Sequence, residues 1–308
     1  MKNAIAIDIG GTNIKYALVD ESGNILFESL RPTTEEGGAI EQLKSAVKEL
    51  LDYATCNSLE ILGIGIGVPS VVDDGVVLFA NNLKEIDNKN LKEIIGKHFN
   101  IPVFVDNDAN LMGLGESRFG KSKDATDVVF LTIGTGIGGT LIINGKLWGG
   151  YRNRGTELGH SIIRFDGKEC SCGAYGCLEA YASVTALIED YKEKLSENKV
   201  VISPDMVIDG KYIVSQYLKN EEYAIEVMNN HFKYIATGLV GIINFFAPQK
   251  VILGGGITES GDFYIENISR LTMQQAMKEA SEFVSIEAAS LGNKAGFYGA
   301  AALVFDSF

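Results

Sequence analysis

The sequence predicts an α/β protein with mixed sheets in two lobes, because strand and helix patterns alternate and two similar glycine-rich units recur. The first unit has an apolar run over residues 4–7 followed by Asp8-Ile-Gly-Gly-Thr-Asn. The second has a run over 128–131, followed after Thr132 and Ile133 by Gly134-Thr-Gly-Ile-Gly-Gly. After each turn the chain becomes apolar again, which predicts a strand, a glycine turn and a second strand. Since one unit opens each half of the chain, we expect two related lobes.

The other elements follow from apolar spacing and turn residues. Helical spacing predicts helices over residues 38–53, 91–99, 108–118, 183–195, 223–246 and 295–305, and apolar runs predict strands over 61–68, 102–105 and 251–253. Residues 196–222 are weakly patterned, so we expect a loop followed by a short helix, and Asn144-Gly145 predicts a hairpin turn. We expect a smaller lobe of residues 1–117 with the C-terminal helix 295–308, and a larger lobe of residues 118–294.

The two glycine turns predict phosphate binding. Glycine lets the backbone approach another group closely, and successive N–H groups in such turns form a concavity that binds anions. A glycine turn in a hairpin is common without a ligand, but two matched turns favour a nucleotide held between two related domains. Neither turn is a P-loop or a Rossmann fingerprint, because in both a strand follows the glycines where those motifs open a helix. Asp8 is expected to be an outer-sphere ligand of Mg²⁺, since a carboxylate repels phosphate.

Composition and net charge limit the classes of function that this chain can have. A chain of 308 residues with 46% hydrophobic residues is long enough for two domains and a large core. The formal net charge of -13 opposes nucleic acid or an anionic membrane as the main partner. No signal peptide is visible, and the longest apolar helical stretch, residues 235–247, is too short to span a bilayer and contains Asn244. We therefore expect a cytoplasmic protein.

Three of the four cysteines lie close together in the sequence, as Cys170, Cys172 and Cys177, and His160 precedes them. Without a secretory signal, a metal site is favoured over a disulfide framework. Three thiolates and one imidazole make a tetrahedral Zn²⁺ site. The alternative is a set of buried free thiols. Cys56 stands apart between a predicted helix and strand, and we expect it to be a core residue.

Five motifs follow one another in a fixed order: Asp8-Ile-Gly-Gly-Thr-Asn, Asp106-Asn-Asp-Ala-Asn, Gly134-Thr-Gly-Ile-Gly-Gly, Glu157-Leu-Gly-His, and Cys-x-Cys-x₄-Cys-x-Glu ending at Glu179. Together they resemble the ROK family of bacterial sugar kinases, repressors and open reading frames, over essentially the whole chain. The spacing from His160 to the cysteines is similar to the zinc signature of that family. The resemblance implies an actin-like, ribonuclease-H-like ATPase fold that binds ATP and a hexose in the cleft between its lobes, and it implies a homodimer.

The resemblance also implies roles for single residues. Asp108 matches the catalytic base that accepts the proton of the attacking sugar hydroxyl, although from the residues alone it could instead cap the following helix. His160 matches a residue that binds structural zinc through one ring nitrogen and the sugar through the other. The remaining substrate ligands are expected to be Asn82 (with Asn81 as the alternative), Asn107, Glu157 and Glu179. The residues expected at ATP and its phosphates are Asp8, Gly10, Gly11, Thr12, Asn13, Lys15, Gly134, Thr135, Gly136, Gly138, Gly255 and Gly256.

Several positions depart from the family pattern. Thr140 and Thr156 stand where relatives often carry glycine or another small residue, Ile86 lies near the place of a frequent tryptophan, and residues 150–156 are bulkier and more basic than usual. These changes leave the kinase prediction intact, but they put in doubt which sugar is phosphorylated. Glucose is favoured, followed by N-acetylmannosamine or another hexosamine and then by fructose.

Two alternatives come from other classes. A sugar-responsive repressor needs a DNA-binding helix-turn-helix ahead of the first glycine turn, and only Met1, Lys2 and Asn3 precede the first strand, which disfavours it. A catalytically inactive sugar-binding protein is disfavoured by Asp108 and by the presence of both glycine turns.

Overall fold

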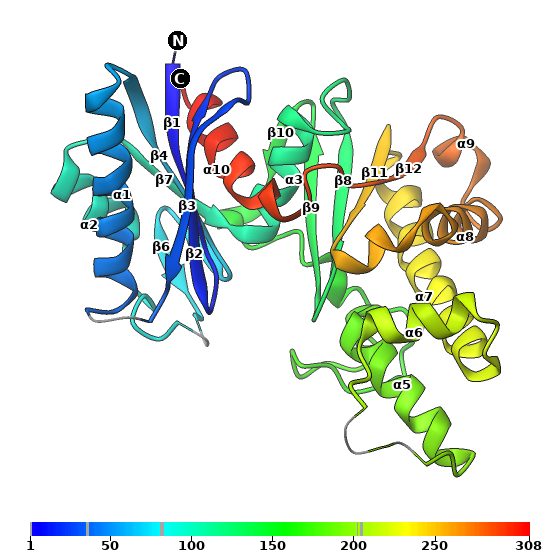
Figure 1. Cartoon of the computed structure of the whole chain (residues 1–308). Helices are drawn as coiled ribbons and strands as arrows, with labels where there is room; N and C mark the ends of the chain where they lie inside the picture. Colours follow the sequence, from blue (N-terminus) through cyan, green and yellow to red (C-terminus); the bar gives the residue numbers. More distant parts are fainter. Residues whose placement is uncertain (1, 35–36, 81–82, 202, 204–205) are drawn as a thin grey trace. The chain divides into compact units, whose positions relative to one another are not determined.

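The structure is a computed structural model that describes residues 2–34, 37–80, 83–201, 203 and 206–308 (Figure 1). The chain divides into two compact units. The first unit comprises Met1–Thr126, Thr140–Thr156 and Ser290–Phe308, and the second comprises Asp127–Gly139 and Glu157–Ala289. None of the described helices combines the length and the apolar character needed to cross a membrane.

The first unit is built on a five-stranded mixed sheet in the order β3-β2-β1-β4-β7. Its strands are β1 (Lys2–Ile9), β2 (Asn13–Asp20), β3 (Ile25–Pro32), β4 (Glu60–Val68) and β7 (Val103–Asn107), and a small two-stranded sheet of β5 (Val71–Asp73) and β6 (Val76–Leu78) follows β4. β1 and β2 form the predicted antiparallel hairpin, whereas β4 runs parallel to both β1 and β7. The register pairs Asp8 with Gly67 and Gly67 with Asp106, so both aspartates lie in one row at the carboxyl edge of the parallel strands.

Helices cover both faces of this sheet. α1 (Gly38–Cys56) buries Leu43, Val47 and Leu50 in a core shared with β1 and β2. α2 (Leu91–Phe99) contacts β7, and α3 (Asp108–Phe119) and α10 (Ala295–Phe305) pack against each other and against the sheet. Figure 1 shows α1 and α10 on opposite faces. A Cβ on Gly65 would lie 1.9 Å from the carbonyl oxygen of Ala300, so glycine is required where α10 crosses β4.

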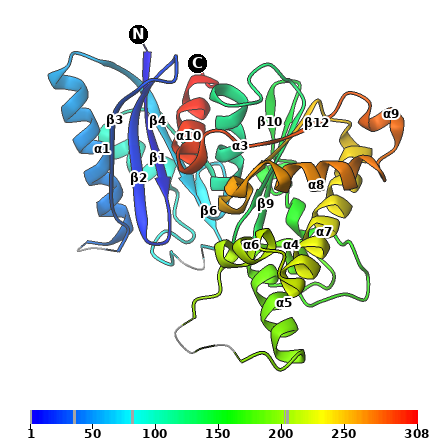
Figure 2. The ribbon, with the colours of Figure 1, turned by 45° about the vertical axis from the view of Figure 1, so that its right-hand side comes forward.

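The second sheet has the order β10-β9-β8-β11-β12. Its strands are β8 (Val128–Ile133), β9 (Ile137–Ile143), β10 (Lys146–Trp148), β11 (Lys250–Gly254) and β12 (Ser285–Ala288), with β11 parallel to β8 and β12. The α-helices described in this unit are α4 (Glu179–Ala182), α5 (Val184–Glu197), α6 (Gly210–Leu218), α7 (Glu222–Phe246), α8 (Asp262–Met273) and α9 (Lys278–Ser281). The long helix α7 contacts each of the others (Figure 2).

Most of the predicted elements are confirmed. Both glycine turns join two strands, α2 has the predicted bounds, and Asn144 and Gly145 have the positive φ values of 53° and 73° that a two-residue hairpin turn requires. The strands β3, β5, β6 and β12 and the helices α4, α8 and α9 were not predicted. The prediction for Cys56 is wrong: it is exposed, because it is the last residue of α1 and the buried stripe of that helix ends at Ala54.

Helix α3 binds the chain at three of the ends of the segments that make up the first unit. The Thr140 hydroxyl donates to the carbonyl oxygen of Ala109 at 2.6 Å, and the Thr156 hydroxyl lies 3.4 Å from Oδ1 of Asn110. At the third point, the fully buried Glu116 accepts hydrogen bonds from the backbone N–H groups of Ser290 and Leu291, both at 2.6 Å. Because this buried carboxylate accepts both N–H groups, it fixes the entry of the last segment into the unit.

We predict that Glu116→Ala lowers the free energy of unfolding by about 3 kcal/mol, because it removes a buried side chain and the acceptor of two partly buried N–H groups. The measurement is urea denaturation followed by circular dichroism. The matched control is Glu21→Ala, at an exposed position in the turn between β2 and β3, which should change the free energy of unfolding by less than about 0.5 kcal/mol. Equal midpoints for the two variants would show that the anchor is not required for stability.

Candidate functional site

The first glycine turn is held by its own backbone and by Thr33. The Gly10 N–H donates to the carbonyl oxygen of Asn13 at 2.9 Å, and the buried Thr33 hydroxyl donates to the carbonyl oxygen of Gly10 at 2.7 Å. Gly11, Thr12 and Asn13 are exposed at the tip of the turn. This is the arrangement that an anion-binding turn needs, with an anchored base and an accessible tip.

Asp8 lies in β1, just before this turn, and its carboxylate fits between two glycines. A Cβ on Gly296 of α10 would lie 2.6 Å from Oδ2 of Asp8, and a Cβ on Gly67 would lie 3.7 Å from Oδ1. Burial raises the pKa of Asp8, and the positive charge of Lys15, its partner across the hairpin, opposes that rise. The amine of Lys15 reaches the carbonyl oxygen of Asn293 at 3.4 Å. A carboxylate in this position can bind a hydrated cation.

Asp108 is the first residue of α3, in the turn that follows β7. Burial raises its pKa to about 6, and the negative charge of Asp8 contributes to the rise. The backbone N–H of Ala109 donates to Oδ1 of Asp108 at 2.8 Å and opposes the shift. A carboxylate with a pKa near 6 is ionised at neutral pH and more basic than an exposed aspartate, which suits a general base.

The helix cap is Asn107 and not Asp108. Oδ1 of Asn107 accepts hydrogen bonds from the backbone N–H groups of Ala109 at 2.9 Å and of Asn110 at 3.2 Å. Its amide nitrogen donates to the carbonyl oxygen of Ser70 at 3.2 Å and retains a second N–H for another acceptor. The capping role considered for Asp108 is therefore assigned to its neighbour.

The second glycine turn is bound on both sides within its own unit. The N–H groups of Ile137 and Val184 donate to Oε2 of Glu179 and to the carbonyl oxygen of Gly134, each at 2.8 Å. A Cβ on Gly136 would lie 2.4 Å from Oε2 of Glu179, so a side chain there would displace this carboxylate from its bond to Ile137. Glu179 thereby joins the turn to the segment that carries the cysteines.

Gly255 and Gly256 follow β11. Gly255 has φ 100°, and a Cβ on it would lie 2.1 Å from the carbonyl oxygen of Ile133 at the end of β8, whereas Gly256 faces open space. The end of β11 therefore packs against the strand that leads into the second glycine turn. Gly138 lies in β9, directly after that turn.

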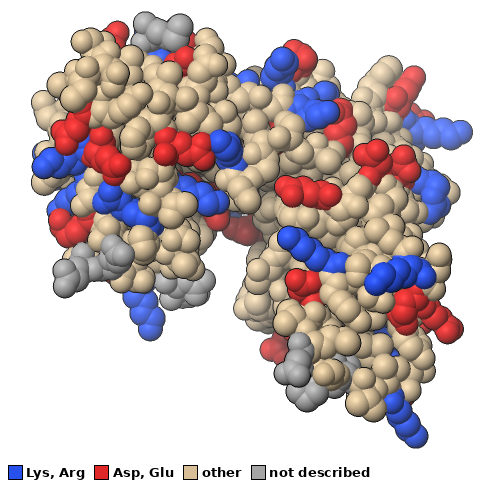
Figure 3. Space-filling model, in the orientation of Figure 1, with Lys and Arg blue, Asp and Glu red and all other residues tan. Residues whose placement is uncertain are grey.

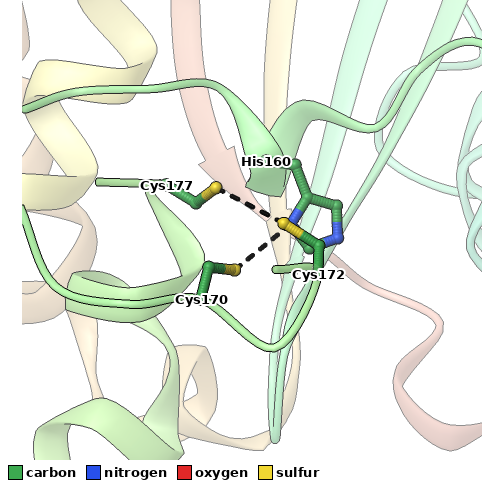
Figure 4. A group of neighbouring side chains, drawn as sticks. All are labelled: His160, Cys170, Cys172 and Cys177. Atoms are coloured by element: carbon green, nitrogen blue, oxygen red, sulfur yellow. Dashed lines mark hydrogen bonds between the residues drawn. The ribbon is translucent and has the colours of Figure 1, made fainter. Parts of the chain in front are cut away.

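His160, Cys170, Cys172 and Cys177 form the predicted cluster (Figure 4). Their ligand atoms all lie within 4.8 Å of one another. Nδ1 of His160 is 3.5 Å from Sγ of Cys170, and Sγ of Cys172 is 3.7 Å from Sγ of Cys177. A tetrahedral zinc ion with bonds of about 2.3 Å to sulfur and about 2.0 Å to nitrogen would place its ligands about 3.8 Å (S···S) and about 3.5 Å (N···S) apart.

The electrostatics of the cluster also suit a cation. Burial raises the pKa of the Cys177 thiol, and the neighbouring thiols of Cys170 and Cys172 raise it further. The closely packed sulfur atoms would repel one another as thiolates unless a cation lay among them. Both the distances and the donor set therefore fit a zinc ion held by one imidazole and three thiolates.

The expected sugar ligands of the second unit adjoin this cluster along the chain. Because Nδ1 of His160 faces Cys170, Nε2 is the nitrogen that can donate to another group. Oε1 of Glu179 accepts a hydrogen bond from the Ser171 hydroxyl at 2.9 Å, between two of the cysteines. Glu157 is exposed and precedes the short helix Leu158–His160. Asn82 and its alternative Asn81 lie outside the described residues.

One contact of the first unit was not foreseen from the sequence. The carboxylate of Asp106, buried two residues before Asp108, accepts a hydrogen bond from the side chain of Asn153 at 2.9 Å. Burial raises the pKa of Asp106, and the amides of Asn110 and Asn153 oppose that rise. The only hint in the sequence was the unusual composition of residues 150–156.

A phosphate-loop pattern was also overlooked: residues 115–122 read Gly-Glu-Ser-Arg-Phe-Gly-Lys-Ser and match the P-loop spacing. Gly115 and Glu116 lie within α3, and Gly120 is its C-cap, so the pattern ends a helix where a P-loop opens one. Oε2 of Glu116 accepts a hydrogen bond from the backbone N–H of Lys121 at 3.1 Å, which puts a carboxylate in the place of an anion. These residues are therefore not a phosphate loop.

Solved structures with the same two-lobed α/β fold define the class of this protein. A ROK hexokinase from Thermus thermophilus has a TM-score of 0.85 and 27% sequence identity, covering 99% of this chain and 98% of that one. A ROK family glucokinase from Streptomyces griseus, solved in complex with glucose and AMPPNP, has a TM-score of 0.79 and 33% identity, covering 99% of both chains. The class is that of the ROK kinases and their relatives.

A model of the ROK family matches residues 4–307, and the chain belongs to this family. Among its relatives, a glucokinase of Thermotoga maritima is 33% identical over 97% of this chain and 96% of its own length. A xylose repressor of Bacillus subtilis is 31% identical over 99% of this chain and 77% of its own length. The family therefore includes both kinases and repressors at similar distances from this sequence.

We predict one zinc ion per chain in gently purified protein, bound through His160, Cys170, Cys172 and Cys177. Cys172→Ser should lower the zinc content and the melting temperature, because a hydroxyl is a far weaker zinc ligand than a thiolate. Elemental analysis and thermal unfolding are the measurements. The control is Cys56→Ser, which removes an exposed thiol outside the cluster. Metal-free protein with an unchanged melting temperature would exclude a structural zinc.

Proposed function

We propose that this protein is an ATP-dependent hexose kinase, which transfers the γ-phosphate to a sugar hydroxyl, with the 6-hydroxyl of glucose as the first candidate. The observation that carries the proposal is Asp108, a half-buried carboxylate at the start of α3 whose pKa desolvation and the charge of Asp8 raise to about 6. Relatives named as glucokinases at 33% and 30% identity support the assignment of a sugar substrate.

The proposed reaction needs one proton acceptor and a site for the nucleotide phosphates. Asp108 accepts the proton of the sugar hydroxyl while the hydroxyl oxygen forms a bond to the γ-phosphorus. The bond from that phosphorus to the bridging oxygen breaks, and ADP leaves. Asn107, Glu157, His160 and Glu179 are proposed to bind and orient the sugar, together with Asn82.

The two glycine turns and Gly255 and Gly256 are proposed to bind ATP, with Lys15 near its phosphates. Asp8 is proposed to hold a hydrated Mg²⁺, which neutralises phosphate charge when it is bound. In this proposal zinc is structural: it fixes His160 and the cysteine segment, and it takes no part in phosphoryl transfer. A homodimer is proposed from the family resemblance.

The acidic composition gives no support to nucleic acid as a partner. On the face drawn in Figure 3, basic and acidic side chains are interspersed over both units. The repressor relatives nevertheless keep a sugar-binding protein without kinase activity as the second candidate. The two candidates differ in the role of Asp108. A kinase needs Asp108 for phosphoryl transfer, whereas in a sugar-binding protein Asp108 would serve only the sugar site.

We predict that Asp108→Asn lowers kcat by about 10²–10⁴-fold, because the amide keeps the shape of the carboxylate but cannot accept the proton. Ionised Asp108 destabilises the folded state at neutral pH, since burial raises its pKa, so the variant should melt at the same temperature or higher. For the unmodified protein, kcat/KM should fall by about tenfold per pH unit below pH of about 6, as the base is protonated. Near-normal turnover by a folded variant would show that Asp108 is not the base.

We predict a clear preference when Mg-ATP turnover is measured by ADP release with glucose, mannose, fructose, N-acetylglucosamine and N-acetylmannosamine. Recognition through buried hydrogen bonds discriminates strongly, because a missing or bulky substituent leaves polar groups unpaired. Glucose should be preferred, since Tyr151, Arg152 and Arg154 make the loop before Glu157 bulky. A preference for an N-acetylated sugar would reassign the substrate but keep the kinase, and no sugar-dependent ADP release would favour the non-catalytic candidate.

A further inference from the structure

Residues 149–156 form a strained loop between β10 and the second unit. Gly150, Arg152, Asn153 and Thr156 have φ values of 72°, 54°, 56° and 67°, in the left-handed region that few side chains tolerate. The loop closes on itself through a hydrogen bond from the Gly155 N–H to the carbonyl oxygen of Gly149 at 2.6 Å. A backbone with this much strain persists only where surrounding contacts determine it.

Asn153 supplies the first of those contacts. Its amide nitrogen donates to the carbonyl oxygen of Val72 at 3.2 Å and to Oδ1 of Asp106 at 2.9 Å. Because both neighbours are acceptors, the nitrogen must face them, and the amide oxygen turns toward Gly149. A Cβ on Gly149 would lie 1.8 Å from that oxygen, so the amide fits tightly against the loop.

Arginines on either side of Asn153 support the same docking. Nη2 of Arg152 lies 2.7 Å from Oδ2 of Asp73, and Nη2 of Arg154 lies 3.7 Å from the same oxygen. Asp73 is only 16% exposed and ends β5, next to the Val72 carbonyl that accepts from Asn153. The loop is thus held along the edge of β5 by three consecutive residues.

On the other side, Asp106 organises the turn that carries the base. Its Oδ1 also accepts hydrogen bonds from the backbone N–H of Asn107 at 2.7 Å and from the side chain of Asn110 at 2.9 Å. Asn107 caps α3, Asp108 begins it, and Asn110 is 3.4 Å from the hydroxyl of Thr156 at the end of the loop. One buried oxygen atom therefore joins the turn of the proposed base to both Asn153 and, through Asn110, the residue before Glu157.

We propose that Asp106 and Asn153 are positioning residues for phosphoryl transfer, which together make the placement of the base Asp108 and of its neighbour Asn107 depend on residues 149–156. The inference rests on the proposed kinase function and extends it to this loop. Neither residue needs to touch the sugar. Their contribution is to hold Asn107 and Asp108 in place within the first unit, where displacements of about 1 Å can cost about 10²-fold in rate.

The test starts from Asn153→Gly, which removes the amide and tolerates the positive φ. Steady-state kinetics with the preferred sugar should show kcat/KM for the sugar lowered by about 10–100-fold and KM for ATP unchanged. The matched control is Asn100→Gly, at an exposed position with φ 54° at the end of α2 in the same unit, which should keep the kinetics of the unmodified protein. Both proteins are compared at temperatures well below their melting temperatures.

A second set of variants separates positioning from general damage to the loop. Asn153→Asp places a carboxylate against Asp106 and the Val72 carbonyl, and it should lower kcat/KM for the sugar more than Asn153→Gly does. Adding Asp106→Asn removes the charge repulsion while its amide oxygen still accepts from Asn107 and Asn110. It should recover about tenfold of the lost activity, a non-additivity that only direct coupling produces.

The outcomes distinguish the two proposals. Unchanged sugar kinetics in Asn153→Gly, an equal rise in KM for ATP, or no recovery in the double variant would overturn the positioning role while leaving the kinase intact. An unmodified protein without sugar-dependent ADP release would overturn the kinase and the positioning role together. Selective loss of sugar kcat/KM with recovery in the double variant would establish the pair.

Discussion

The burial of negative charge at one sheet edge is the constraint on which the first unit depends. Asp8, Asp106 and Asp108 follow or end parallel strands whose register places their carboxyl ends together. Burial raises the pKa of each, and the surroundings of the three carboxylates differ: Lys15 pairs with Asp8 across the hairpin, three N–H groups donate to Asp106, and one N–H of α3 donates to Asp108. The proposed base therefore accepts fewer hydrogen bonds than Asp106 two residues before it, as expected where reactivity is retained at the expense of stability.

In the second unit, the comparable constraint is that the glycine turn and the cysteine segment are bound to one side chain. Glu179 binds both through its two oxygens: Oε2 accepts from Ile137 beside the glycine turn, and Oε1 accepts from Ser171 between the cysteines. A metal ion in the cluster would therefore stabilise the turn as well as the cysteine segment. This coupling gives a physical reason for a structural metal in a protein whose proposed chemistry does not use it.

Periodicity predicted the elements that bury one complete face, and it failed where burial is partial. α1, α2 and α7 have long apolar stripes, and the hairpin of β1 and β2 is almost fully buried, so each was predicted from the sequence. β3 is half-exposed along its length, and its alternation is too weak to distinguish it from a loop. Cys56 was misassigned because a helical stripe ends before the helix does.

The candidate site was predictable in its residue types but not in its contacts. The cysteine spacing predicted the cluster, because the ligands lie close in sequence. The pairing of Asp106 with Asn153 joins residues 47 apart through a loop with three non-glycine residues of positive φ, and no local pattern encodes that. The P-loop pattern at residues 115–122 shows the reverse case, in which spacing matches but the pattern ends a helix instead of opening one.

The order of the chain segments bears on synthesis and folding. The first unit starts at the N-terminus but is completed only by Ser290–Phe308, whereas the second unit is complete at Ala289. α10 packs against α3, which lies far earlier in the chain, and its Gly296 packs against the carboxylate of Asp8. Contacts of such long range form slowly, because the loop-closure entropy must be overcome before they stabilise anything. On a ribosome, the unit that begins first would be the last to fold, and its three clustered aspartates would stay unassembled until α10 emerges.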